Sequence, residues 1–410
     1  MTAPRAVPAL RVGPLEVWPP VVLAPMAGIT NAPFRRLCHG FGAAALADAG
    51  AVSPQDVDPT ARAPRPAGAH GGLFVSEMIT ARGLAERNDK TLRMARFADD
   101  EPVRSIQLYG TDPRSMGEAV RFLTGDEAAD HVDLNFGCPV AKVTRKGGGA
   151  ALPVHRALFR DVVRAAVRGA GAVPVTVKLR IGVDDRLTTF LDAGRIARDE
   201  GAAAVALHAR TATQHYSGRA DWRTIAELRA ALPDVPVLGN GDVWQAADAL
   251  RMVDETGCDG VVVGRGCLGR PWLFGDLARA FAGRPVPPAP PLGEVTEVLR
   301  RHARLLAAWL TEPVAVRDVR KHVGWYLQGY PVGGDVRRRL TTASTLAELD
   351  DRLAALAAER PDLGVVDGAD GQPRGKTSGP ISVTLPDGWL ASADDPTPVV
   401  AEELEAVSGG

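Results

Sequence analysis

The stretch HVDLNFGCP, residues 131–139, is a short apolar run that ends in an Asn, a Gly and a Cys-Pro pair. Seven more runs of this kind occur along the chain, and each ends in a polar or glycine-rich cluster. They begin at Val21, Leu73, Ser105, Val173, Ala202, Val235 and Asp259. Their apolar residues are continuous and do not alternate with polar ones, which is typical of parallel strands buried on both faces.

Most gaps between these runs contain a helical pattern. Residues 154–171 and 244–257, for example, have apolar residues at three- and four-residue spacing. Eight strand–helix units in roughly 260 residues predict an α/β fold, a (β/α)8 TIM barrel. A doubly wound sheet would need fewer strands and would not explain the polar cluster after every run. In a barrel these clusters meet on one face, where active sites are built.

Composition divides the rest of the chain. The segment after Phe41 is rich in Ala, Pro, Gly and Asp, and the last fifty residues carry nine acidic side chains against two basic ones. Pro-rich and acidic stretches of this kind form linkers and disordered tails. We expect an N-terminal extension (1–17), a TIM barrel (18–285) with a surface insertion (42–72), a Pro-rich linker (286–293), a small all-α helical domain (294–360) and a disordered acidic tail (361–410).

Charge and cysteine content restrict the class of protein. In 410 residues, 48 Lys and Arg balance 49 Asp and Glu, so nucleic-acid binding would require a local basic patch. The four cysteines, Cys38, Cys138, Cys258 and Cys267, form no C-x-x-C pair, so neither a disulfide framework nor a zinc site is indicated. No signal peptide or membrane span is visible. We expect a cytoplasmic monomer without a metal.

Two glycine-rich loops follow the last two predicted strands. The second, GRGCLG at 264–269, formally matches the dinucleotide motif G-x-G-x-x-G. A Rossmann fold would require an acidic residue about 20 positions later, at the end of a further strand, and the sequence has a Pro-rich stretch there. In a TIM barrel the loops after strands seven and eight form a phosphate site, to which Arg265 adds a charge. The alternative is that both loops are ordinary tight turns.

Three further polar residues are expected at the same face. Lys178 ends the fifth strand, and a lysine there is costly unless it meets an anion, for which a reduced flavin is suitable. Gln107 offers a donor and an acceptor, as the edge of a flavin ring requires. His208 either reaches the same cofactor or is a structural histidine.

Several motifs together resemble the tRNA-dihydrouridine synthase family of bacterial type. They are APMAGITNAPFR, SIQLYG, DLNFGCPVAKVTRKGGGAAL, VKLRIG, HARTATQHYSG, GNGDV, VVGRGCLGRPWLF and VRDVRKHVGWYL, in this order over most of residues 18–355. The resemblance implies an FMN-containing barrel that reduces the C5=C6 bond of particular uridines in tRNA, with NADPH as electron donor. It also implies a helical domain that binds the RNA.

The resemblance assigns residue roles. It makes Cys138 the proton donor, whereas an isolated cysteine is more often a small buried apolar residue. It assigns the cofactor to Pro25, Met26, Ala27, Gln107, Lys178, His208, Asn240, Gly241, Asp242, Gly264 and Arg265. The substrate residues are expected from position and charge. Asn135, three residues before Cys138, could hydrogen-bond the uracil edge, and Lys142 and Arg145 in the adjacent basic loop either contact the nucleotide or are simply solvated. Arg320 and Lys321 belong to the clearest local excess of basic residues in the chain and are expected to contact the RNA. A neutral thiol with a pKa of about 8.5 can donate a proton at neutral pH. We expect the glycine cluster 147–149 to be a flexible flap.

Two other functions remain open at this point. An FMN barrel that acts on a free pyrimidine or related metabolite would keep the phosphate loops and Lys178, but would not need a basic helical domain. A catalytically silent tRNA-binding protein would not need Cys138, Lys178 and Arg265 together. The sequence does not identify the modified uridine, and it contains no motif that separates NADPH from NADH.

Overall fold

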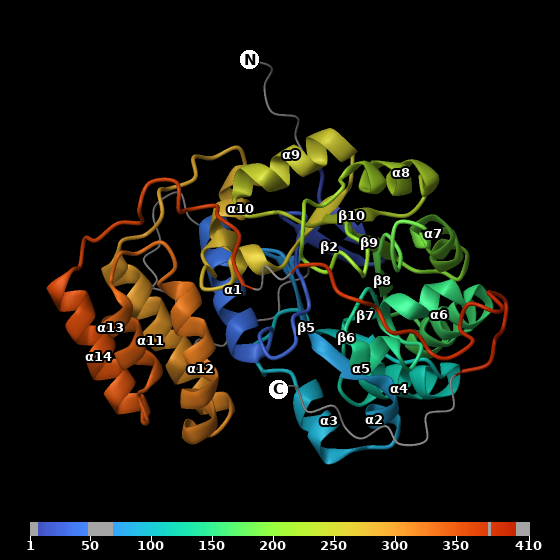
Figure 1. The fold of residues 1–410 in the computed structure, drawn as a ribbon, viewed down its shortest axis with the longest axis horizontal. Helices are drawn as coiled ribbons and strands as arrows, with labels where there is room; N and C mark the ends of the chain where they lie inside the picture. Colours follow the sequence, from blue (N-terminus) through green and yellow to red (C-terminus); the bar gives the residue numbers. More distant parts are fainter. Residues whose placement is uncertain (1–6, 48–68, 376–378, 399–410) are drawn as a thin grey trace.

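The computed structural model describes residues 7–47, 69–375 and 379–398. Eight parallel strands form a closed barrel, in the order β10-β11-β3-β5-β6-β7-β8-β9 (Figure 1). They are β3 (Val21–Leu23), β5 (Leu73–Thr80), β6 (Ser105–Tyr109), β7 (His131–Phe136), β8 (Val175–Arg180), β9 (Ala204–His208), β10 (Val237–Asn240) and β11 (Gly260–Val263). Each predicted run contains one of these strands, and the TIM barrel is confirmed.

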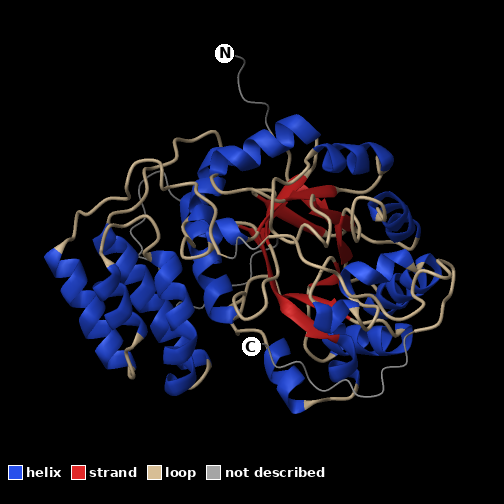
Figure 2. Cartoon of the chain, viewed as in Figure 1, coloured by secondary structure: helices blue, strands red, loops and turns tan. Residues whose placement is uncertain are grey.

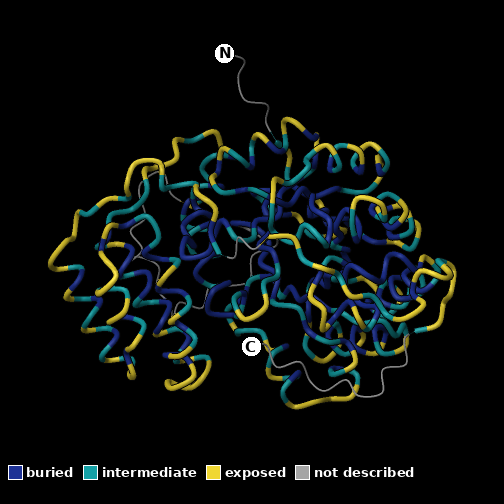
Figure 3. Tube along the Cα trace, in the orientation of Figure 1, coloured by how far each residue is buried: buried dark blue, intermediate teal, exposed yellow. Residues whose placement is uncertain are grey.

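Helices surround the strands (Figure 2). They are α1 (Ala32–Ala47), α2 (Ala81–Ala85), α3 (Asp89–Ala95), α4 (Pro113–Gly125), α5 (Ala141–Thr144), α6 (Arg156–Ala170), α7 (Phe190–Asp199), α8 (Arg223–Ala231), α9 (Ala246–Thr256) and α10 (Leu273–Phe281), with 3-10 turns η1 (Gly149–Val154) and η2 (Arg265–Cys267). Helix α6 illustrates the pattern, because its buried Leu158, Val162 and Ala166 recur every four residues on one stripe. These stripes cover the barrel, whose strands are mostly buried (Figure 3).

The end of the barrel at which the strands begin is closed by a small sheet. Strands β1 (Leu10–Val12) and β2 (Leu15–Trp18) form a hairpin, to which β4 (Ala69–His70) pairs. Buried Leu10, Val12 and Val17 pack with interior side chains of the barrel. The expected extension 1–17 is therefore part of the fold from residue 10 onward. The expected insertion 42–72 is shorter, because α1 continues to Ala47 and β4 begins at residue 69, and residues 48–68 lie outside the described part.

A helical domain follows the barrel, as predicted, and lies to the left in Figure 1. It contains α11 (Leu292–Trp309), α12 (Glu312–Tyr326), α13 (Gly334–Thr341) and α14 (Leu346–Glu359), which share a hydrophobic core of their own. Helix α11 begins two residues before the expected start of the helical domain at residue 294. Phe34 on α1 packs against His302 and His322, with ring centroids 5.6 and 6.1 Å apart, so the domain is seated on the barrel wall.

The expected disorder of residues 361–410 is wrong for the part that the structure describes. Residues 361–375 and 379–398 pack along the protein, from the helical domain to α6 (red in Figure 1). Arg374 and Trp389 on this segment are buried. The sequence of this segment has no helix or strand periodicity, which is why it was expected to be disordered. Individual buried side chains, such as these two, attach it to the rest of the protein. Within the described ranges, no helix is long and apolar enough to cross a membrane.

Candidate active site at the barrel mouth

A cavity of about 90 Å³ lies where the strands end. Nine residues predicted for the cofactor line it, namely Pro25, Met26, Lys178, His208, Asn240, Gly241, Asp242, Gly264 and Arg265. They come from the ends of β3, β8, β9, β10 and β11. The structure thus brings together residues that are up to 240 positions apart in the chain. Ala27 and Gln107, also predicted for the cofactor, are not among the lining residues.

Lys178 reaches this cavity from β8. Its Nζ donates to Oδ1 of Asn240 at 3.0 Å, and the Asn240 amide donates to the carbonyl of Val262 at 2.7 Å. Burial, reinforced by the nearby Arg180 charge, lowers the pKa of Lys178 to about 8. A cation in this setting, hydrogen-bonded to a neutral amide, is stabilised by an anion that enters the cavity.

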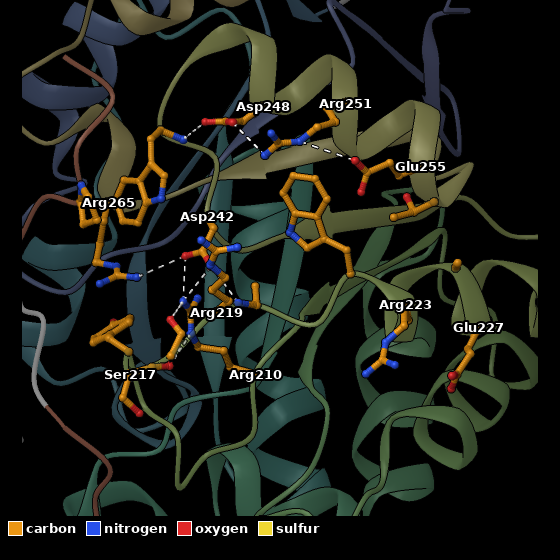
Figure 4. A pocket seen from close by; sticks show the side chains of 18 residues that line it. Arg210, Ser217, Arg219, Arg223, Glu227, Asp242, Asp248, Arg251, Glu255 and Arg265 are labelled. Atoms are coloured by element: carbon orange, nitrogen blue, oxygen red, sulfur yellow. Dashed lines mark hydrogen bonds and ion pairs between the residues drawn. The ribbon is translucent and has the colours of Figure 1, made fainter. Parts of the chain in front are cut away.

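The loop after β10 is held by arginines. Nη2 of Arg210 donates to both carboxylate oxygens of Asp242 at 2.8 Å, and Arg265 lies 3.9 Å from the same carboxylate (Figure 4). Gly241 has φ +125°, and a Cβ there would lie only 2.7 Å from that of Ala220. The loop therefore requires glycine at this position. The carboxylate of Asp242 orients the two guanidinium groups, which leaves only its backbone for the predicted contact with phosphate.

Arg210 was not singled out from the sequence, although it lies in the motif HARTATQHYSG. Its side chain is only 1% exposed, and its Nε and Nη2 donate to the carbonyls of Ser217 and Gly218. Its Nη1 has no hydrogen-bond partner among the described residues. A buried guanidinium N–H without a partner, next to the glycine loop, fits an anionic group such as the phosphate of a mononucleotide cofactor.

A larger cavity of about 1080 Å³ adjoins the first, beside α8 and α9 (Figure 4). The two share Tyr216, Asp242, Trp244 and Arg265. The Arg265 guanidinium lies 4.3 Å from the ring centroid of Tyr216 and 5.0 Å from that of Trp244, a cation–π arrangement that holds the arginine between the cavities. The outer cavity is lined by both charge signs, including Arg251 and Glu255.

Cys138 follows β7, which is the fourth strand from β11 in either direction round the barrel. The thiol is thus across the mouth from the loop after β11, which carries Arg265. Burial raises its pKa above the ordinary value, and the weaker opposing effects include the charges of Arg180 and Lys178. The thiol is therefore protonated at neutral pH. Oδ1 of Asn135 accepts from the backbone N–H groups of Gly137 and Cys138 at 3.1 and 2.9 Å. Asn135, predicted to bind the substrate, also shapes the loop.

A buried hydrogen-bonded chain leads to Asn135 from deep in the barrel. It runs through Ser105, His131, Thr176, Asp133, Gln107 and Asn135. Thr176 donates to Asp133 at 2.5 Å, and Gln107 Nε2 donates to the other carboxylate oxygen at 2.7 Å. Asn135 Nδ2 then donates to Gln107 Oε1 at 2.9 Å. Gln107, expected at the flavin edge, is engaged at both ends of its amide. Asp133 was missed, although a charged residue inside an apolar run is a signal of buried polar chemistry.

Arg180, two positions after Lys178 on β8, was also missed. It is buried, and it donates to the carbonyls of Gly137, Thr211 and His215 at 2.7–3.0 Å. It therefore joins the Cys138 loop to the loop after β9. His208 is also buried, and burial together with neighbouring cations lowers its pKa well below the ordinary value. The ring is neutral at physiological pH.

The predicted substrate residues occupy two regions. Lys142 and Arg145 are exposed on and beside α5, close in sequence to Cys138. Arg320 is exposed on α12, whereas Lys321 donates to the carbonyl of Gly28 and pairs with Asp318. Lys321 thus ties the helical domain to the loop after β3. The glycine cluster 147–149, expected to be a flexible flap, is buried.

The fold and the site define a TIM-barrel protein with a cation-lined cavity at the ends of its last strands and a neutral thiol at the same mouth. No group of three or more metal-ligating side chains occurs within the described ranges. The family model for dihydrouridine synthase (Dus) matches residues 22–360. The chain belongs to the dihydrouridine synthase family, as its motifs predicted.

Relatives cover almost the whole chain. It is 51% identical over 405 residues to a probable tRNA-dihydrouridine synthase of Mycobacterium tuberculosis, covering 98% of this chain and 97% of that one. It is 52% identical to a protein of the same description from Mycobacterium leprae, covering 95% and 100%. It is 37% identical to tRNA-dihydrouridine synthase B of Xanthomonas axonopodis, covering 86% and 98%.

Proposed function

We propose that this protein binds FMN at the barrel mouth and reduces particular uridines of tRNA to 5,6-dihydrouridine. The observation that carries the proposal is a protonated thiol, Cys138, at the same barrel mouth as a cation-lined cavity and opposite the loop after β11 that carries Arg265. Hydride addition to one carbon of a double bond must be followed by protonation of its neighbour. A donor on the side away from the hydride source suits this chemistry.

The described residues fit the cofactor. The unpartnered Nη1 of Arg210 and the charge of Arg265 suit its phosphate, beside the backbone of Gly241 and Asp242 and near Gly264. Lys178 and Asn240 reach the same cavity, where Lys178 would stabilise negative charge on the ring. Pro25 and Met26 line the cavity and would lie against the ring, with Ala27 following them in the loop. His208 would contribute a neutral ring.

FMN, when bound, supplies the hydride that is added to C6 of uracil. Cys138 then transfers its thiol proton to C5, which is possible because burial keeps the sulfur protonated. Asn135 holds the Cys138 loop through two backbone N–H groups, and its Nδ2 is engaged by Gln107 and Met78, so its contribution to substrate binding would come through the position of this loop. A uracil stacked within folded tRNA cannot reach this depth, so the base must be flipped into the mouth.

We assign the surrounding tRNA contacts to exposed basic side chains. Lys142 and Arg145 stand beside the Cys138 loop, and Arg320 lies on the helical domain, with Lys321 supporting the loop after β3. Basic side chains at these places would contact phosphates. The electron donor in the proposal is NADPH, and the protein acts as a cytoplasmic monomer.

A single-turnover experiment tests the role of Cys138. FMN-loaded Cys138→Ala protein is reduced with NADPH and mixed with unmodified tRNA, and flavin reoxidation is followed by absorbance. We expect a rate about 10²- to 10⁴-fold below that of the unaltered protein, which is the usual contribution of a general acid. Cys258→Ala, at a buried cysteine outside the mouth, is the matched control and should react normally. A normal rate for Cys138→Ala refutes the acid role.

The same assay separates the two other functions. Equal turnover of free uridine and tRNA would identify a reductase of free pyrimidines. A colourless protein that cannot be reconstituted with FMN would identify a binding protein without catalysis.

A further inference from the structure

The C-terminal segment, residues 361–375 and 379–398, follows the rim of the barrel mouth, and we call it the C-terminal strap. Gly375 approaches the side chains of Leu268 and Arg265 after β11. The N–H of Ile381 donates to the carbonyl of Thr213, in the loop after β9, at 2.9 Å. The strap then reaches the segment after Cys138. It contacts loops that follow three different strands, and it ends beside the thiol loop.

Trp389 is the main anchor of the strap at this end. Its side chain is only 5% exposed, and its Nε1 donates to the carbonyl of Ala151 at 3.0 Å. Its ring stacks on His155, with 3.6 Å between centroids, and His155 Nε2 donates to the Trp389 carbonyl at 2.6 Å. The N–H of Arg156 donates to the carbonyl of Ala393 at 2.7 Å. These contacts attach the strap to η1 and the start of α6.

In space, the glycine segment 147–149 lies between the Trp389 ring and the backbone of Cys138. A Cβ on Gly147, at φ +75°, would lie 2.6 Å from the Trp389 ring. A Cβ on Gly149 would lie 2.4 Å from the carbonyl oxygen of Cys138, and the N–H of Ala150 donates to that oxygen at 3.0 Å. The indole therefore packs against the glycine segment at Gly147, and the other end of the segment binds the Cys138 carbonyl through the N–H of Ala150.

We infer that Trp389 is a positioning residue for Cys138. Three consecutive glycines have the greatest backbone freedom of any residues, so this segment cannot fix the thiol loop by itself. Contacts with the strap restrain the backbone of this segment. A displacement of about 1 Å of a reacting group can slow a reaction by about 100-fold. By keeping the Cys138 thiol in place, the strap therefore affects the rate of the protonation step. The inference rests on the proposed acid role of Cys138.

The test compares Trp389→Ala, Trp389→Phe and Leu390→Ala in the full-length, FMN-loaded protein. Leu390 is the adjacent side chain and is 63% exposed, so its removal controls for changes in the strap. For Trp389→Ala we expect reoxidation by tRNA to slow by about 10- to 100-fold. FMN affinity, the rate of flavin reduction and KM for tRNA should stay within about twofold, because they depend on other parts of the mouth. Trp389→Phe, which keeps the stacking on His155, should recover most of the rate.

Hydrogen exchange of residues 138–155 supplies a readout that does not depend on catalysis. It should quicken in Trp389→Ala and stay unchanged in Leu390→Ala. A normal reoxidation rate in Trp389→Ala, or an equal loss of FMN affinity and rate, overturns the positioning role. If Cys138→Ala reacts normally while exchange in Trp389→Ala still quickens, the acid role fails and the strap retains only a structural contact.

Discussion

The two sides of the barrel mouth are built in different ways. The side formed by the loops after β9, β10 and β11 is cationic, and it is held by ion pairs such as that of Arg210 with Asp242. The Cys138 side is held by the amide of Asn135, by the Arg180 guanidinium and by Trp389, which is more than 230 positions away along the chain. A site for an anion needs charge at approximately the right place, whereas a proton donor needs its atom fixed in direction, and this takes support from further away.

Removal of the Arg210 side chain should have the largest effect. In Arg210→Met we expect FMN affinity to fall by about 100-fold or more, because both the phosphate and the Asp242 carboxylate lose their partner. Titration of apoprotein with FMN, followed by flavin fluorescence, measures the change. Arg219→Met, at an exposed arginine in the same loop, should bind normally. Equal affinities for the two variants would show that Arg210 does not contact the cofactor.

Asp133→Asn should affect the thiol side more than the cationic side. An amide cannot accept with both oxygens as the carboxylate does, so either Thr176 or Gln107 loses its partner. We expect a loss of about 1–3 kcal/mol in the free energy of unfolding. We also expect reoxidation by tRNA to slow by about 10-fold through Asn135. Denaturant titration and the single-turnover assay measure these, with exposed Asp126→Asn as control. If flavin reduction slowed while reoxidation by tRNA did not, Asp133 would not act on the thiol side of the mouth.

The pH dependence of Cys138 alkylation tests the thiol side directly. Only the thiolate reacts, and burial raises the pKa of Cys138 above its ordinary value. The acid form therefore persists to higher pH, so alkylation should be slow at pH 8 and reach half its maximal rate at a higher pH than alkylation of the same cysteine in the denatured protein. Mass spectrometry separates Cys138 from the three buried cysteines. A midpoint below 8 would mean that the sulfur is a thiolate and cannot serve as the acid.

The smallest effect is expected outside the mouth. Arg320→Glu on α12 should weaken tRNA binding a few-fold and reduce the slope of affinity against salt by about 1, because one phosphate contact is lost. Binding at several salt concentrations measures both quantities. Arg168→Glu, an equal charge change at an exposed position on α6, should leave them unchanged. Identical curves for the two variants would remove Arg320 from the RNA-binding surface.

Much of the cationic side could be predicted from the sequence. The strands are apolar runs, and their polar ends converge wherever a barrel closes, so Lys178 and Arg265 could be placed at the mouth without knowledge of contacts, and the family resemblance added Asn240. Arg210 was missed because a buried charge looks like a surface charge until its partner is known, whereas the position of Asp133 inside an apolar run was a signal that was not used. Trp389 was missed for a different reason. The segment around it has the composition of a disordered tail, and its order comes from a few distant contacts that leave no periodic pattern.

The chain from Ser105 to Asn135 also has a consequence for how the barrel assembles. Ser105 is paired in register with His131, Gln107 with Asp133, and Asp133 with Thr176, so the polar ladder crosses β6, β7 and β8 at matched positions. A slip of one residue in either pairing would turn these side chains to the opposite face of the sheet and leave a buried carboxylate without donors. Apolar strands of similar composition can pair in several registers at little cost. During folding, Asp133 therefore favours the correct register of β6, β7 and β8 over registers shifted by one residue.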